Sequence, residues 1–362
     1  MFYANYTPSC IAPKSTIQTH YIVHGQAPTL DANNWVDLLC RAGLLWPLPG
    51  DVKKPADTVT PQRGKEKKYT AKPFVKWAGG KGQLLETIRN RYPAGLGSTI
   101  TKYAEPFAGG CAVMFDILNR YNMDAVFIND RNAELINAFR IVKSNVEALI
   151  PMLALYQSEY LPLDNVGRKQ YYHAKRDRFN QLKMAGDKSV ECAALFIFIN
   201  RTCFNGLYRV NRKGQYNVPA GAYKNPLICD EENLRNVSKA LQNVEIVCGD
   251  YHKLAGFIDA KTFVYFDPPY RPLTRTASFT SYTESAFTDL DQIGLARFVS
   301  EMSARGAKIL LSNSDPKNSD DGDNFFDDLY AAYKIERVEA SRAISSKKDK
   351  RGKVKELLIS NF

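Results

Sequence analysis

The stretch KYAEPFAGGCAVMFDILNRYNMDAVFINDRNAELINAFRIVKSN, residues 102–145, decides the fold of this chain. Two short apolar runs in it, at 102–107 and 124–130, are typical of buried strands. The runs at 109–121 and 133–145 are longer and have the length of helices. Strands that alternate with helices along a chain pack as a mostly parallel sheet with helices on both faces. The stretch therefore predicts an α/β fold with a doubly wound sheet.

Three later apolar runs extend the same pattern. They are VEIVCGD (244–250), TFVYFDPPY (262–270) and AKILLSN (307–313), and polar or turn residues bound each of them. Strands that are buried on both faces of a parallel sheet have this composition. We expect these runs to join the sheet, with a mostly helical insertion before them at 166–242.

The basic charge of the chain is concentrated in this insertion. The chain has a formal net charge of +11, and residues 168–240 hold 14 Lys/Arg against 6 Asp/Glu, which is +8 of that total. Aromatic residues are interleaved with the basic ones, a combination that suits a nucleic-acid-binding surface. These aromatics are Tyr171, Tyr172, Phe179, Phe204, Tyr208, Tyr216 and Tyr223. Composition leaves open the alternative of a solvated helical face with ordinary core aromatics.

Cysteine, histidine and hydropathy patterns exclude several classes of protein. The seven cysteines are scattered without a C-x-x-C pair, and there are only four histidines. This disfavours a disulfide framework and a zinc cage, so we expect no metal. No apolar run approaches the ~18 residues that span a membrane, and the first residues lack the basic end and apolar run of a signal peptide. We expect a soluble cytoplasmic protein with no membrane partner.

Two glycine-rich turns precede predicted helices. FVKWAGGKGQLL (74–85) carries a lysine in its turn, and AEPFAGGCAV (104–113) follows a strand. Gly109 and Gly110 allow a ligand to approach the backbone at a helix N-terminus. Asp130 ends the next strand, 21 positions after Gly109, where dinucleotide-binding folds place a carboxylate that accepts hydrogen bonds from ribose. The pair indicates a nucleoside-containing cofactor; a tight turn with a surface aspartate is the alternative.

The tetrapeptide Asp267-Pro268-Pro269-Tyr270 follows the predicted strand TFVYF and suits methyl transfer to an exocyclic amine. The lone pair of adenine N6 is delocalised into the ring, so the site must localise it. A carboxylate and a backbone carbonyl that accept the two N–H bonds aim this lone pair at an electrophilic methyl group. We assign these acceptors to Asp267 and the Pro268 carbonyl, presented by the restricted backbone of the two prolines. Tyr270 offers a flat face for a base extruded from a duplex.

Together these motifs resemble the Dam family of DNA adenine-N6 methyltransferases. The matching segments are FVKWAGGKGQLL, AEPFAGG, NRTCFNGLYRVNRKGQYNVPAGAYKNP (200–226), FDPPYRPLTRTASFTSYTESAF (266–287) and SRAISS (341–346). Their order is similar to the α-group arrangement: cofactor motifs, then the recognition insertion, then DPPY. The resemblance covers residues 74–362. It implies a Rossmann-like S-adenosylmethionine-dependent methyltransferase sheet with a mostly helical target-recognition insertion.

The resemblance also implies roles for individual residues, with S-adenosylmethionine as methyl donor and double-stranded DNA as partner. The residues that match cofactor motifs are Trp77, Lys81, Phe107, Gly109, Asp130 and Asp267. The residues that match contacts to the DNA target are Phe204, Asn205, Leu207 and Arg209. Phe204 is expected to insert into the duplex. Arg209 is expected to read a guanine, because one arginine donates two hydrogen bonds to guanine O6 and N7.

Two residues depart from the pattern of the family. Cys111 replaces the last glycine of the FxGxG motif, and we expect activity to survive because a cysteine side chain is small. Ala222 stands where several family members carry a basic residue that helps to read the recognition sequence. GATC is therefore the leading target sequence, and Ala222 leaves other sequences open.

The expected organisation has four parts. They are an unassigned N-terminal extension and linker (1–70), the cofactor-binding part of the catalytic domain (71–165), the target-recognition insertion (166–242) and the remainder of the catalytic domain with DPPY (243–362). We expect a monomer that acts at the nucleoid.

Rival functions stay open at this point. One is a catalytically silent DNA-binding regulator of the same fold. Another is a cytosine-N4 methyltransferase, although those enzymes more often carry Ser-Pro-Pro-Tyr; RNA or protein-amide methylation more usually goes with Asn-Pro-Pro-Tyr. Base deamination is excluded because the chain lacks the H-x-E and P-C-x-x-C zinc signature.

Overall fold

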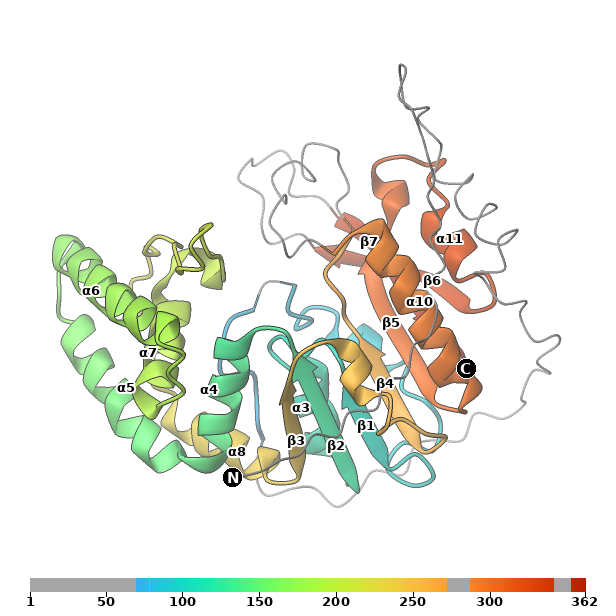
Figure 1. The fold of residues 1–362 in the computed structure, drawn as a ribbon, viewed down its shortest axis with the longest axis horizontal. Coiled ribbons are helices and arrows are strands. Elements are labelled where there is room, and N and C mark those ends of the chain that lie inside the picture. The colour runs from blue at the N-terminus through green and yellow to red at the C-terminus, as the bar shows by residue number, and fades with distance from the viewer. Residues whose placement is uncertain (1–69, 78, 272–286, 342–352) are drawn as a thin grey trace, which may run out of the picture. The chain divides into compact units, whose positions relative to one another are not determined.

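The described strands form one mixed sheet in the computed structural model of the protein (Figure 1). The structure describes residues 70–77, 79–271, 287–341 and 353–362, so the extension expected over residues 1–70 lies outside it except for Thr70. The sheet order is β3-β2-β1-β4-β5-β7-β6. The strands are β1 (Lys102–Glu105), β2 (Ala125–Asp130), β3 (Val244–Cys248), β4 (Thr262–Phe266), β5 (Lys308–Ser314), β6 (Lys334–Ser341) and β7 (Lys353–Ser360).

Strands β1 to β5 run parallel, and β7 runs antiparallel to both of its neighbours, β5 and β6. Every residue of β4 is buried, as expected for a central strand covered on both faces. The three later apolar runs in the sequence form β3, β4 and β5. The α/β fold predicted from the alternation of strands and helices is confirmed.

Helices accompany the sheet along the chain. They are α2 (Leu85–Arg89), α3 (Ala112–Arg120), α4 (Ala133–Ser144), α8 (Glu231–Leu241), α10 (Asp289–Ala304) and α11 (Phe325–Leu329). Helix α4 begins directly after β2, where the side chain of Asn132 accepts a hydrogen bond from the backbone N–H of Leu135 and caps the helix. Across the described residues, no helix is long and apolar enough to cross a membrane.

A layer of three helices separates β2 and α4 from α8 and β3 in the chain. It consists of α5 (Val146–Tyr160), α6 (Asn165–Met184) and α7 (Val190–Thr202). Helix α7 is apolar almost all round and packs against α4, α5 and α6 (Figure 1). Because α5 also packs against α7, the helical layer begins before residue 166, where the sequence placed the start of the insertion.

The aromatic residues of the insertion are mostly core residues. Tyr172, Phe179 and Tyr216 are at most 2% exposed, whereas Phe204 is 51% exposed. Of the two interpretations that the sequence left open, that of ordinary core aromatics therefore holds for Tyr172, Phe179 and Tyr216, and a nucleic-acid-binding surface is wrong for them. Interleaving along the chain does not reveal which side of a helix faces α7, and burial against α7 decides their role.

The strand order reverses between β1 and β4, and this position fixes where a ligand binds. From β1 the sheet continues to β2 on one side, and from β4 it continues to β5 on the other side. The connections that follow these two strands therefore lead away from this point of the sheet in opposite directions. Open α/β sheets bind ligands in the crevice beyond the carboxyl ends of such strands. The glycine turn that contains Gly109 follows β1, and Asp267 follows β4.

Candidate active site

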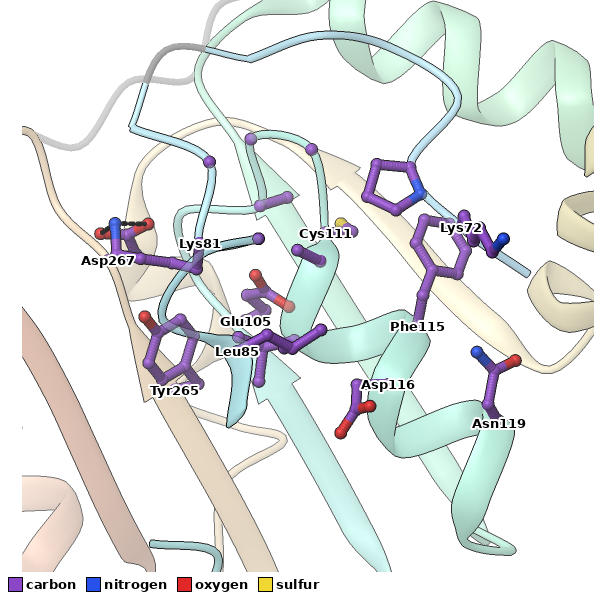
Figure 2. A pocket seen from close by; sticks show the side chains of 18 of the residues that line it. Lys72, Lys81, Leu85, Glu105, Cys111, Phe115, Asp116, Asn119, Tyr265 and Asp267 are labelled. Atoms are coloured by element: carbon purple, nitrogen blue, oxygen red, sulfur yellow. Dashed lines mark hydrogen bonds and ion pairs between the residues drawn. The ribbon is translucent and has the colours of Figure 1, made fainter. Parts of the chain in front are cut away.

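A cavity of about 1170 Å³ lies at this crevice. Its wall is built by residues of 70–77 and 79–82, the glycine turn after β1, helices α2 and α3, and the end of β4 (Figure 2). Four residues predicted to bind a cofactor line it, namely Trp77, Lys81, Gly109 and Asp267. The fold thus brings the two glycine-rich turns and the start of DPPY to one place, although Lys81 and Asp267 are 186 positions apart.

Two side chains hold the carboxylate of Asp267. The ammonium group of Lys81 lies 2.6 Å from Oδ1 and 2.7 Å from Oδ2, and Figure 2 shows the two groups facing each other. The hydroxyl of Ser312, on β5, donates to Oδ1 over 3.0 Å. Lys81 is only 5% exposed, so water screens the ion pair weakly. A carboxylate has about four lone-pair sites, so Oδ2 retains one for a further N–H donor.

Side chains of β7 and α10 hold the rest of the DPPY turn, which does not line the cavity. The hydroxyl of Tyr270 donates to the carboxylate of Glu356 over 2.7 Å. Burial, together with the charges of Asp267 and Glu356, raises the pKa of Tyr270, so its phenol is neutral at pH 7. Gln292 donates to the Pro269 carbonyl over 3.1 Å. No described residue donates a hydrogen bond to the Pro268 carbonyl.

The glycine turn after β1 packs against Trp77. Gly109 has a φ of +47°, and a Cβ there would lie 2.8 Å from the indole of Trp77, so the turn requires glycine. The backbone N–H of Gly109 donates to Asp130 over 3.0 Å. The second carboxylate oxygen of Asp130 accepts from the backbone N–H of Asn132 over 2.8 Å. Asp130 therefore links the glycine turn to the start of α4.

Asp130 and Phe107 lie beside the cavity but do not line it. The ring of Phe107 packs against Tyr251 and Phe287, with ring centroids 5.5 and 5.9 Å apart. Tyr251 follows the end of β3, the neighbour of β2. Phe107 and Asp130 thus face the carboxyl ends of β2 and β3, while the other predicted cofactor residues face the junction of β1 and β4.

Glu105 and Tyr265 are among the residues of the cavity wall to which the sequence analysis assigned no role. Glu105 ends β1, and its carboxyl group accepts from the Tyr103 hydroxyl over 2.9 Å and from the Met114 backbone N–H over 3.2 Å. Burial raises the pKa of Glu105 to about 8, the Asp267 charge contributing and the Tyr103 hydrogen bond opposing. Its place at the end of a central strand, directly before the glycine turn, is the sequence signal that could have indicated it.

Glu105 is expected to make the free protein less stable as the pH rises from about 4.5 to about 8. The pKa of this group is 4.5 without the fold and about 8 within it, so in this range the unfolded state releases a proton that the folded state keeps. Glu105→Gln stays neutral and should therefore gain free energy of unfolding relative to the wild type as the pH rises. Denaturant titrations at several pH values measure this difference, and parallel stability curves for the two proteins would contradict it.

Cys111 adopts the backbone conformation of the glycine that it replaces. Its φ is 55°, in the left-handed region, and it directly precedes α3. The side chain is 1% exposed and also contributes to the cavity wall. Burial raises the pKa of the thiol well above its usual value, so the thiol is neutral at pH 7. The residue thus packs within the fold despite the strain of this conformation for a side chain larger than glycine.

The residues predicted to contact DNA lie together on one loop after α7, and none of them lines the cavity. Phe204 is half-exposed, Asn205 is exposed with a φ of 54°, and Leu207 packs partly against the core. Arg209 is exposed, and its Nε donates to the Asn217 side chain over 2.8 Å. The backbone N–H of Phe204 donates to the Pro219 carbonyl over 2.9 Å, which holds this loop next to the segment that carries Ala222.

Within the described part of the chain, no group of three His, Cys, Asp or Glu side chains is placed to hold a metal ion. The polar groups of the cavity wall come from side chains and from the backbone. They combine a buried carboxyl group, an ion pair and backbone groups of glycine turns.

Comparison with known proteins places this site in a family. Residues 77–344 match the model of the D12 class N6 adenine-specific DNA methyltransferases. The Type II methyltransferase M.MjaIII of Methanocaldococcus jannaschii is 50% identical over 293 residues, which cover 80% of this chain and 99% of the relative. The DNA adenine methylase of Haemophilus influenzae is 35% identical over 295 residues, with coverages of 80% and 94%. With its two glycine-rich turns and Asp267 meeting at one cavity, this chain belongs to the D12 class of N6 adenine-specific DNA methyltransferases.

Proposed function

We propose that this methyltransferase modifies adenine N6 within GATC sites of duplex DNA, and that the target adenine flips out of the helix to reach Asp267. The observation that carries the proposal is the pairing of two acceptors at the end of β4. The Asp267 carboxylate lines the cavity, and the adjacent Pro268 carbonyl receives no hydrogen bond from a described residue. An exocyclic amine has two N–H donors, which these two acceptors match.

Lys81 and Ser312 give Asp267 its orientation. The Lys81 ammonium bridges both carboxylate oxygens, and the Ser312 hydroxyl fixes Oδ1. A carboxylate held in this way needs little rearrangement when an amine donates to its remaining lone pair. As the two N–H bonds are accepted, the nitrogen lone pair becomes localised and points away from the base. The proton that the nitrogen loses after methylation has a carboxylate acceptor within hydrogen-bond reach.

The cavity also fits S-adenosylmethionine, the methyl donor of this family. The Glu105 carboxyl group is buried and forms no ion pair with a described residue, so by giving up its proton it can balance a positive charge on a bound ligand. Trp77 and Gly109 supply an apolar face and an exposed backbone turn next to it. Bound at this site, the donor would supply an electrophilic methyl group. Trp77, Gly109, Glu105 and Lys81 are the residues that we propose to hold it, with Asp130 and Phe107 at the β2 side.

The recognition loop after α7 is proposed to contact the duplex. Phe204 is an exposed aromatic residue on a strongly basic insertion. At an exposed position, a hydrophobic side chain stabilises the fold little through burial. A wedge between base pairs favours extrusion of a neighbouring base. The exposed guanidinium of Arg209 suits a guanine edge, and the +8 charge of residues 168–240 suits the phosphate backbone. Because the substrate is DNA, we place the protein at the nucleoid.

The GATC assignment is supported by the resemblance of segment 200–226 to the Dam family. Curated relatives named DNA adenine methylase align over about 80% of this chain. Ala222, which is exposed beside the recognition loop, is the position at which this chain departs from that pattern.

Transfer of tritiated methyl groups from S-adenosylmethionine to short duplexes tests the proposal. We expect incorporation into a GATC duplex and about 5- to 150-fold less into duplexes with any one of the four bases exchanged, since one mismatched base pair costs about 1–3 kcal/mol. A GATC duplex with 2-aminopurine at the target adenine should become more fluorescent when the enzyme binds, because the base leaves the stack. Equal incorporation into the exchanged duplexes contradicts GATC. Unchanged fluorescence, with binding shown separately, contradicts base flipping.

A further inference from the structure

The segment that carries Trp77 and Lys81 is bonded to the recognition insertion. The side chain of Asn200, in α7, accepts from the Lys76 backbone N–H over 2.8 Å and donates to the Lys76 carbonyl over 2.7 Å. Arg201 donates to the Phe74 carbonyl over 3.1 Å. The cofactor segment therefore reaches Asp267 through Lys81 at one end and is anchored to α7 at the other.

A second connection runs through Tyr208, which lies between Leu207 and Arg209 on the recognition loop. Its ring stacks on the indole of Trp77, with centroids 6.0 Å apart and an interplanar angle of 28°. Its hydroxyl donates to the carboxylate of Glu134 over 2.7 Å. One side chain of the recognition loop thus touches both the cofactor segment and the catalytic domain.

Glu134 joins three parts of the structure. It lies in the first turn of α4, which begins where Asp130 and Asn132 link β2 to the glycine turn. Its carboxylate accepts from Tyr208 and, over 2.8 Å, from the ammonium of Lys183 on α6. Burial opposes charge here, but the hydrogen bonds from Lys183 and Tyr208 outweigh it and lower the pKa of Glu134. A buried carboxylate with two donors of this kind is costly to leave unpaired, so its contacts hold the loop firmly.

We propose that Tyr208 is a positioning residue that couples cofactor binding to DNA recognition, with Glu134 as its fixed partner. The proposal rests on the proposed function, in which Trp77 contacts the cofactor and Arg209 the DNA. A ligand that orders Trp77 restricts the ring of Tyr208 and hence the backbone of the two recognition residues beside it. DNA that orders the loop restricts Trp77 in return, so each ligand tightens the binding of the other by the same factor.

Calorimetric titration of the full chain with S-adenosylhomocysteine, which cannot react, measures this coupling. The dissociation constant is determined without DNA and with a saturating duplex that carries the sequence methylated by the wild type. We expect the duplex to tighten binding at least ~5-fold in the wild type. Tyr208→Phe removes only the hydroxyl and should bring this factor below ~2, in the range of uncoupled sites. Glu134→Gln keeps the side-chain size and should have the same effect.

Tyr171→Phe is the matched control. The Tyr171 hydroxyl also donates to a glutamate, Glu159 of α5, but the ring of Tyr171 packs against Tyr160 and Phe198 and not against Trp77. This variant should keep the wild-type coupling factor. Thermal unfolding identifies any variant that does not fold. If one of Tyr208→Phe and Glu134→Gln does not fold, the coupling factor of the other variant tests the proposal.

Two outcomes overturn the proposal. One is a wild-type coupling factor in both Tyr208→Phe and Glu134→Gln; the other is a wild type whose two ligands bind independently. A wrong target sequence or the absence of base flipping would be detected in the wild-type methylation and fluorescence assays. Failure of the coupling is detected separately, in the titrations.

Discussion

Asp267→Asn is expected to lower kcat for methyl transfer by at least about a hundredfold to a thousandfold, the loss that follows removal of one precisely aimed polar contact in an active site. The amide keeps the volume of the carboxylate and an oxygen that accepts from Lys81 and Ser312, so the fold of the site should survive. It loses the charge and the lone pair that accept the N–H of the target amine. Binding of DNA and of S-adenosylhomocysteine should change little.

Single-turnover kinetics with separate measurement of both dissociation constants distinguish catalysis from binding. Asp259→Asn is a suitable control, because Asp259 lies just before the opposite end of β4 and pairs with Lys102 on the surface. This control should keep the wild-type rate. A loss of DNA affinity in Asp267→Asn as large as the loss of rate would contradict the catalytic role of this residue.

Arg209→Ala is expected to relax specificity at one guanine of the site and to cost about 1–3 kcal/mol of discrimination there, or about 5- to 150-fold in kcat/KM. The Nε and Nη2 atoms of Arg209 are oriented by the side chain and backbone carbonyl of Asn217, at 2.8 and 3.3 Å. These two contacts hold the guanidinium in one orientation at an exposed position on the loop. Without it, the guanine has no side chain that donates two hydrogen bonds to its edge.

The measurement compares kcat/KM for GATC with that for duplexes changed at the guanine. Arg212→Ala provides the contrast, because Arg212 is exposed on the turn three residues later. Loss of a residue that contacts phosphate should weaken binding to all duplexes alike and should reduce the salt dependence of DNA binding by about one ion. If Arg209→Ala shows the same site preference as the wild type, Arg209 does not read the guanine.

The strands and helices near the site follow from local sequence patterns. The runs at 124–130 and 133–145 predict β2 and α4 almost to the residue, because short buried strands and capped helices have strong local signals. The motif residues Trp77, Lys81, Gly109 and Asp267 could also be predicted, and the parallel sheet explains why they meet. Their convergence depends on β1 and β4 being neighbours, which the motif order suggests but local patterns do not determine.

The supporting residues could not be predicted in this way. Ser312 reaches Asp267 because β5 pairs with β4, and Glu356 reaches Tyr270 because β7 inserts between β5 and β6. Neither residue belongs to a glycine turn or to DPPY. Tyr172 and Phe179 show the converse limit, since a buried aromatic and an exposed one have the same composition signal until the packing of α6 on α7 is known.

Modification-aware sequencing of DNA from a methylation-free host that expresses this chain tests the central claim most directly. We expect N6-methyladenine at GATC on both strands and none in a host that expresses Asp267→Asn. N4-methylcytosine, or DNA without any modification although the folded protein is present, would contradict it.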